Sequence, residues 1–240
     1  MMAAAWAFWG LLFWQGSGLF GLNLRNIIIF VFVLIVVHTI YRLIRGSREK
    51  KKRQTDLQAF AASGGWTFTP HAAAENFHNW RSYSILNHGW DEISGMLERG
   101  NDGGNAFVFD YRYRERRGKH IRYYTQTIAG FYSLHLNLPF FALAEETIGS
   151  RLGEVFGYKD IDFSSHPGFS KKFNLAGHDE LQIRQTFDPR ILSFLENLPG
   201  IQIDGGGNYI FIYYHARTVP VENLNAFLGT AQNIYNLFRR

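Results

Sequence analysis

Residues 107–114 read FVFDYRYR, and this stretch indicates the fold of the larger part of the chain. Aromatic side chains hold its odd positions and polar side chains hold most of its even positions, which is the period of two of a half-buried β-strand. Residues 121–127, IRYYTQT, repeat the alternation. The two stretches therefore predict an antiparallel hairpin that turns through residues 116–119, with residues 95–99 as a neighbouring strand.

The residues that follow predict helices and further strands. Asp179 and Asp188 each stand where a helix N-cap is expected. Residues 201–204 and 208–215 are predicted strands joined by a glycine turn, and an amphipathic helix is predicted at the C-terminal end. This order of elements is typical of the α+β class, so we expect an N-terminal transmembrane helix followed by an antiparallel-sheet domain packed with several helices.

The membrane segment is predicted from residues 27–37, which read IIIFVFVLIVV. Extended to residue 44, the run is about 27 Å long as a helix, close to the roughly 30 Å thickness of the hydrocarbon core. A buried core helix or strand is the alternative, but the cationic residues that follow favour a membrane span. Residues 3–22 form a second candidate, either a second span or a segment lying in the membrane interface.

The basic residues are concentrated directly after this span. Residues 42–54 contain seven basic residues and one acidic residue, whereas residues 55–240 contain 17 basic and 19 acidic residues. The positive-inside rule then places residues 55–240 in the cytoplasm, on the inner face of the cell membrane. The domain itself is not basic, so we expect no nucleic-acid binding.

These features divide the chain into three parts. Residues 1–45 are predicted to form a membrane anchor, residues 46–54 a basic juxtamembrane linker, and residues 55–240 a cytoplasmic α+β domain with a short helix near Leu57. The chain has no cysteine, which excludes disulfides, thiolate metal sites and cysteine nucleophiles.

Two sets of basic residues are candidates for contact with anionic lipid or an anionic ligand, one after the span and one at the hairpin tip. The alternative for the tip is a solvated hairpin whose charges protect an exposed edge. The candidates are Arg42, Arg45, Arg48, Lys50, Lys51, Lys52, Arg53, Arg116, Arg117 and Lys119.

A catalytic or metal site is weakly indicated at one place. Asp160 and Asp162 lie two positions apart in a stretch that reads as extended, and His166 follows, so the three side chains form a candidate oxygen and nitrogen ligand set. We favour the alternative, an edge strand with solvated carboxylates, because there is no second ligand cluster. No metal and no cofactor is therefore expected.

Several segments together resemble an uncharacterised family of bacterial membrane-anchored proteins. They are FGYKDIDF at 156–163, HPGFS at 166–170, GHDE at 177–180 and GGGN at 205–208. The resemblance covers about residues 55–240 and implies a membrane anchor with a cytoplasmic domain. It implies no known activity and no catalytic residues.

The functional expectation is a non-catalytic, membrane-tethered cytoplasmic domain that binds or scaffolds an unidentified protein or small molecule, with the lipid bilayer as partner of the N-terminal segment. One alternative is a metal-assisted hydrolase that uses Asp160, Asp162 and His166. The other alternative is a lipid-binding domain, since 17% of the residues are aromatic and would be able to line a cavity.

Overall fold

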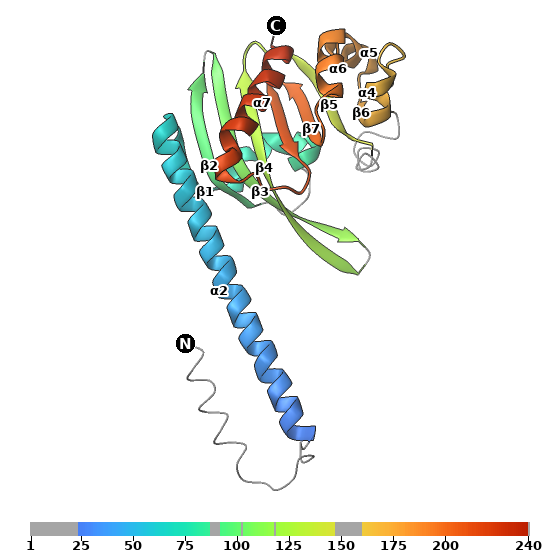
Figure 1. Cartoon of the computed structure of the whole chain (residues 1–240). Helices are drawn as coiled ribbons and strands as arrows, with labels where there is room; N and C mark the ends of the chain where they lie inside the picture. The colour runs from blue at the N-terminus through green and yellow to red at the C-terminus, as the bar shows by residue number, and fades with distance from the viewer. Residues whose placement is uncertain (1–23, 87–91, 102, 118, 147–159, 240) are drawn as a thin grey trace. The chain divides into compact units, whose positions relative to one another are not determined.

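A computed structural model describes residues 24–86, 92–101, 103–117, 119–146 and 160–239 (Figure 1). Contacts within the chain divide it between Lys51 and Lys52 into two units, and each is described by itself. Residues 3–22, the second candidate membrane segment, lie outside the described residues.

Helix α2, Leu24–Gly64, contains the predicted span. It is long and apolar enough to cross a membrane, and its apolar side chains between Ile27 and Ile44 are exposed. Residues 46–54, expected to form a linker, belong to the same continuous helix. The reason is that Arg, Lys, Gln and Glu all have high helix propensity, so a change from apolar to charged composition does not end a helix.

The second unit begins at Lys52, and its described residues form eight strands in one antiparallel sheet, ordered β1-β2-β3-β4-β8-β7-β5-β6. The predicted hairpin is formed by β3 and β4, which pair without interruption from Gly104↔Ser133 to Arg117↔His120. The strands are β1 Thr67–Ala72, β2 Glu92–Asn101, β3 Gly104–Arg117, β4 His120–Ser133, β5 Leu138–Glu145, β6 Phe173–Gly177, β7 Ile201–Gly207 and β8 Tyr209–Tyr214.

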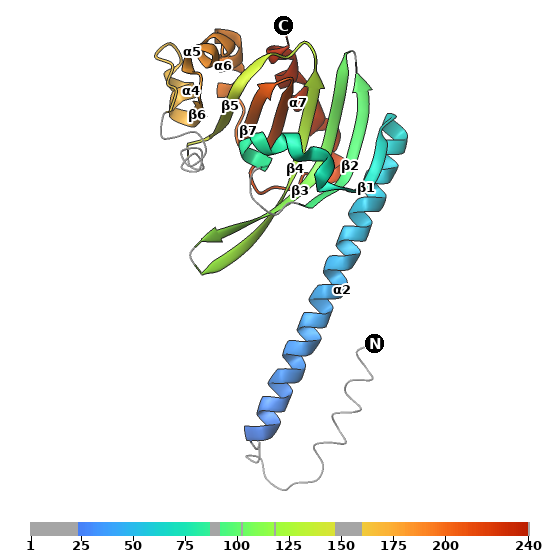
Figure 2. The same cartoon turned by 180° about the vertical axis from the view of Figure 1, so that it is seen from behind.

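Helical segments cover both faces of this sheet (Figures 1 and 2). On one face the last turns of α2 pack with α5, α6 and α7 in a core that includes Val108, Ala129 and Ile212. On the other face η1 and η2 bury a second core around Phe109 and Phe211. The helical segments of this unit after α2 are η1 Ala74–Ser82, η2 Ser84–Leu86, α4 Pro167–Lys172, α5 Glu180–Thr186, α6 Pro189–Glu196, η4 Val221–Asn223 and α7 Leu224–Phe238.

The predicted helix starts are confirmed by their cap contacts. The Asp179 side chain accepts a hydrogen bond from the Gln182 amide, and the Asp188 side chain accepts from the amides of Arg190 and Ile191. The predicted glycine turn at 205–207 is shorter than expected, because Gly205 and Gly206 continue β7 and pair with β8. The chain turns at Gly207, which has φ +53°, and Asn208. Side-chain rings of β5 lie where β-carbons on Gly205 and Gly206 would stand, so the glycines serve close packing.

The fold class is confirmed: an N-terminal apolar helix precedes an eight-stranded antiparallel sheet packed with several helices. The α+β prediction rested on alternation and capping, which are local properties of the sequence.

Candidate functional site

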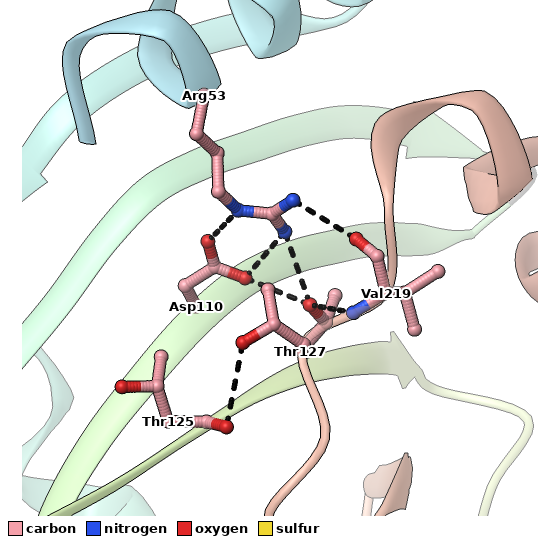
Figure 3. Close-up of polar contacts among 6 residues, drawn as sticks. Arg53, Asp110, Thr125, Thr127 and Val219 are labelled. Atoms are coloured by element: carbon pink, nitrogen blue, oxygen red, sulfur yellow. Dashed lines mark hydrogen bonds and ion pairs between the residues drawn. The ribbon is translucent and has the colours of Figure 1, made fainter. Parts of the chain in front are cut away.

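The first polar site of the second unit joins helix α2 to the middle of the sheet (Figure 3). Arg53 lies on α2, and Asp110 lies on β3, 57 positions later. The Arg53 guanidinium donates from Nε to Oδ2 and from Nη2 to Oδ1 of Asp110, the second contact at 2.8 Å. Asp110 is buried and Arg53 is partly buried, so this two-point ion pair is largely withdrawn from water.

Two further residues complete the hydrogen bonding of this pair. Thr127 of β4 donates from Oγ1 to Asp110 Oδ1 at 2.8 Å and accepts from Arg53 Nη2 at 3.1 Å. Val219, in the segment before η4, accepts from Arg53 Nη1 at 2.9 Å through its carbonyl, and its amide donates to Thr127 Oγ1 at 2.9 Å. We call Arg53, Asp110, Thr127 and Val219 the Arg53 cluster.

The Arg53 cluster attaches the end of α2 to the sheet. Each side-chain polar atom of Arg53, Asp110 and Thr127 has a partner inside the cluster. The four residues come from α2, β3, β4 and the segment leading to α7. The expectation that Arg53 contacts anionic lipid or ligand does not agree with this geometry, because its guanidinium group is bound to Asp110.

The other predicted basic residues after the span lie on exposed positions of α2. Arg42, Arg48, Lys50 and Lys51 are exposed. Arg45 forms an exposed ion pair with Glu49 at 2.7 Å, and Lys52 forms one with Asp56 at 2.5 Å. Exposed pairs of this kind contribute little to stability, so Arg45 and Lys52 can release their carboxylate partners and bind other anions.

Residues 111–125 form the outer part of the hairpin, which we call the β3–β4 arm; beyond Arg112 it extends past the sheet as two strands (Figure 2). Strand β2 pairs with β3 only as far as Arg112, and β8 pairs with β4 only as far as Ile128. Lys119 lies exposed in the turn of the arm, and Arg116 and Arg117 end the strand that enters the turn.

A second polar site lies on the opposite face of the sheet. Asp204 of β7 is almost completely buried, and its Oδ2 accepts hydrogen bonds from the Ser84 hydroxyl and the Ile85 amide, both at 2.7 Å. The Tyr213 hydroxyl donates to Oδ1 at 3.3 Å. Nearby, the Tyr83 hydroxyl donates to the Gly206 carbonyl at 2.6 Å. Together these contacts attach η2 to the sheet.

Burial raises the pKa of Asp204 to about 6, even though the hydrogen bonds from Ser84, Ile85 and Tyr213 favour the charged form. Burial likewise raises the pKa of Tyr213 well above its ordinary value. An acid of this kind titrates near neutral pH, which is a property shared by catalytic carboxylates and by structural ones. Its partners here are a hydroxyl, an amide and a phenol, all of them donors that hold the carboxylate in place.

The structure does not bring the predicted ligand set together as a metal site. Among the residues described, no group of three His, Asp or Glu side chains is placed to hold a metal ion. Asp160 Oδ1 accepts from the Leu175 amide at 2.8 Å, and desolvation raises its pKa. Asp162 is exposed, and the His166 ring lies against the hydroxyls of Ser165 and Ser193.

Sequence reasoning missed Asp110 and Asp204 as the centres of polar sites. Each is a carboxylate within an otherwise apolar or aromatic strand, at 107–111 and 201–204. Charged residues at buried strand positions are rare unless they are paired, so these two positions carried a signal for buried partners. The partners themselves are 57 and 120 positions away, which no local pattern reveals.

The fold has a counterpart among solved structures, although no protein-family model and no curated protein matches the sequence. The counterpart is the crystal structure of the mycobacterial trehalose monomycolate transport factor A, TtfA, with a TM-score of 0.53. The match covers 78% of this chain and 94% of that chain at 11% sequence identity. At this identity the likeness shows a shared fold, and the resemblance to an uncharacterised bacterial family remains a prediction.

Proposed function

We propose that the chain is a membrane-tethered, non-catalytic protein that takes part in binding or transporting lipids. The observation that carries this proposal is the fold shared with TtfA, whose title describes a transport factor for trehalose monomycolate. The match extends over almost the whole of that chain, so the shared fold is that of the complete TtfA structure and not of a short motif. A helix able to span a membrane precedes this domain here, which fits work at a lipid surface.

The non-catalytic part of the proposal is supported by what the polar sites do. The Arg53 cluster is an ion pair with its hydrogen bonds closed on itself, and the contacts of Asp204 hold η2 on the sheet. Each site places a hydroxyl beside a carboxylate, Thr127 beside Asp110 and Ser84 beside Asp204. All four residues are buried and their hydrogen bonds join elements of the fold, whereas a nucleophile has to reach its substrate. The hydrolase alternative needs Asp160, Asp162 and His166 to converge, and within the described residues they form no metal-holding group.

The cytoplasmic placement of the domain is part of the same proposal. It is supported by the basic residues that follow the apolar run in α2, because such residues are retained on the cytoplasmic side.

Photocrosslinking of the intact chain tests lipid binding. The chain is reconstituted in nanodiscs that contain trace amounts of a photoactivatable diacyl phosphatidylglycerol or a photoactivatable glycolipid. After irradiation, we expect crosslinked peptides from residues 52–110 or 126–240 in addition to those of the membrane helix. The control is a chimaera in which an unrelated soluble domain replaces residues 52–240, and its crosslinks should be confined to the anchor.

The outcome that contradicts the proposal is crosslinking of both probes only within residues 1–51 and the β3–β4 arm. That result would leave the domain with a scaffold role and no lipid site of its own.

A further inference from the structure

The β3–β4 arm carries a charge opposite to that of the domain from which it extends. Residues 111–125 contain six basic residues and one acidic residue, a net charge of +5. The remaining residues of 55–240 contain 11 basic and 18 acidic residues, a net charge of −7. A separation of charge on this scale gives the arm its own positive field, which attracts anionic surfaces.

The register of the two strands places apolar and cationic positions on one face of the arm. Arg114 is opposite Tyr123, and directly opposite residues in an antiparallel pair share a face. Ile121, two residues before Tyr123 on the same strand, lies on that face too. The Ile121 side chain is 50% exposed and that of Tyr123 is 54% exposed. The Arg112 guanidinium lies 5.0 Å from the centre of the Tyr123 ring.

The opposite face of the arm is packed at its base, whereas Arg122, nearer the tip on the same face, is exposed. Tyr111 and Tyr113 are buried and stack on each other at 5.5 Å, and Tyr124 stacks on Tyr113 at 5.6 Å. The arm is therefore held at its base on one side, while Ile121 and Tyr123 are exposed on the other. A two-stranded hairpin is at best marginally stable in water, so an exposed apolar face on it is stabilised by contact with another surface.

Solvated charges that protect an edge would explain the arginines and Lys119 alone. They do not explain why an isoleucine and a tyrosine stand exposed between them. Apolar and aromatic side chains beside arginine and lysine are the composition of segments that lie in the headgroup region of a membrane.

The arm is long compared with the stretch of helix that separates its base from the predicted span. Arg53, which is bound to Asp110 at the base of the arm, follows Ile44 by nine residues of helix, about 14 Å of rise. From Asp110 to Arg117 the strand β3 extends for seven residues, about 23 Å. The reach of the arm from its base thus exceeds the length of helix between that base and the end of the predicted span.

We propose that the β3–β4 arm docks on the anionic headgroups of the leaflet from which α2 emerges, with Arg114 and Lys119 on lipid phosphates and Ile121 and Tyr123 in the interface. This inference requires the membrane tether and is independent of whether the domain binds lipid elsewhere.

The test uses the intact chain, which contains no cysteine, so one introduced thiol is labelled uniquely. His120, exposed at the start of β4, is replaced by Cys and labelled with an environment-sensitive fluorophore. In nanodiscs with about one-third phosphatidylglycerol we expect a blue-shifted, stronger emission than in phosphatidylcholine nanodiscs. About 0.5 M NaCl should reverse the shift because the Debye length falls to a few ångströms.

Matched variants in the labelled background separate the charge contribution from the apolar one. Arg114→Gln with Lys119→Gln should lower the ratio of docked to undocked arm roughly 30-fold, at about 1 kcal/mol for each basic residue. Lys171→Gln with Arg239→Gln removes two exposed charges elsewhere in the domain and should leave that ratio unchanged. Ile121→Ser with Tyr123→Ser should lower the ratio of docked to undocked arm. The matched control is Leu134→Ser with Leu181→Ser, which changes two exposed leucines outside the arm and should leave that ratio unchanged.

Equal emission in the two kinds of nanodisc overturns the proposal. It is also overturned if the control variants lower the ratio of docked to undocked arm as much as the arm variants do. Reversal by millimolar inorganic phosphate also overturns it, because the arm would then be a site for a soluble anion. Near-UV circular dichroism of each variant checks that the domain remains folded.

Discussion

The guanidinium group of Arg53 and the carboxylate of Asp110 form a two-point ion pair that attaches the end of α2, the helix with the candidate membrane span, to the β3–β4 hairpin of the sheet. The contact lies in the second unit, so it holds the C-terminal part of α2 on the domain. The β3–β4 arm extends from the same strand, so the base of the arm and the end of α2 are joined through Asp110.

Removal of one partner from the ion pair of Arg53 and Asp110 should destabilise the domain. In Arg53→Met, Asp110 is left as a buried, uncompensated charge, so we expect a loss of about 3 kcal/mol in the free energy of unfolding. The measurement is urea unfolding of the detergent-solubilised chain, followed by near-UV circular dichroism. Lys52→Met is the neighbouring control, since its pair with Asp56 is exposed, and it should cost less than about 1 kcal/mol.

Arg53→Met combined with Asp110→Leu should recover part of the loss, because both charges are then removed together. A double variant as unstable as the sum of the two single variants would contradict the assignment of Arg53 and Asp110 as direct partners.

Asp204 gives the domain a predicted dependence on pH. Its pKa is raised to about 6 by burial, so the folded state binds the proton more tightly than the unfolded state. The stabilisation is complete below the ordinary pKa of an aspartate and is lost as the pH rises through about 6. The free energy of unfolding attributable to Asp204 should fall by an amount on the order of 3 kcal/mol between pH 4 and pH 7.

The difference in unfolding free energy between the native chain and Asp204→Asn, measured across this range, isolates that contribution from the other carboxylates. The Asn oxygen can still accept from Ser84 and Ile85. Ser84→Ala should move the transition to higher pH, because the lost hydrogen bond favours the charged form. A pH-independent difference between native chain and Asp204→Asn would contradict the raised pKa.

Adjacent glycines of β7 should differ in their tolerance of a methyl group. A β-carbon on Gly205 would clash with the ring of Phe141, which is buried and packed against Phe187 at 4.9 Å. A β-carbon on Gly206 would meet the ring of Phe140, which is 44% exposed and can turn outward. We expect Gly205→Ala to cost about 1–3 kcal/mol and Gly206→Ala less than about 1 kcal/mol.

Thermal unfolding of the two glycine variants side by side checks this expectation. If the two variants lost equal amounts of stability, the turn-forming property of glycine, which the sequence suggested, would matter more than the packing of the β5 rings.

The parts of the fold that the sequence predicted are those governed by local chemistry. Alternation of aromatic and polar residues predicted β3 and β4, and the caps Asp179 and Asp188 predicted α5 and α6. The continuity of α2 was missed because a cluster of like charges was interpreted as a linker, although its residues favour helix.

The glycines of β7 and the pair formed by Arg53 and Asp110 were not predictable in this way. Glycine at 205 and 206 is favoured by rings from another strand, and Arg53 is paired across 57 positions. Both depend on contacts between residues that are far apart in the sequence, and neither produces a periodic pattern in it. The basic hairpin tip was recognised, but the exposure of Ile121 and Tyr123 beside it required the structure.

Divalent metal should not stabilise the chain through Asp160, Asp162 and His166. We expect the melting temperature to be unchanged by Mg²⁺, Mn²⁺ or Zn²⁺, because the described residues offer no three-ligand group. Asp162→Ala should cost less than about 0.5 kcal/mol, as is usual for an exposed residue. Asp160→Ala should cost about 1 kcal/mol, since the Leu175 amide loses its acceptor. A saturable rise in melting temperature with one metal, lost when Asp160→Ala and Asp162→Ala are combined, would restore the hydrolase alternative.

The orientation of the chain in the membrane is the last prediction. A fluorescent protein that folds only in the cytoplasm, fused after Arg240, should be fluorescent, because the basic residues after Ile44 retain that side of the span in the cytoplasm. Replacement of Arg42, Arg45, Arg48, Lys50 and Lys51 by Gln should weaken this retention and give a mixed population. Arg53 is left unchanged in that variant, because its loss would also destabilise the domain through Asp110. A fusion that is dark, together with protection of the domain from protease added on the cytoplasmic side, would refute the orientation and remove the anionic leaflet from reach of the β3–β4 arm.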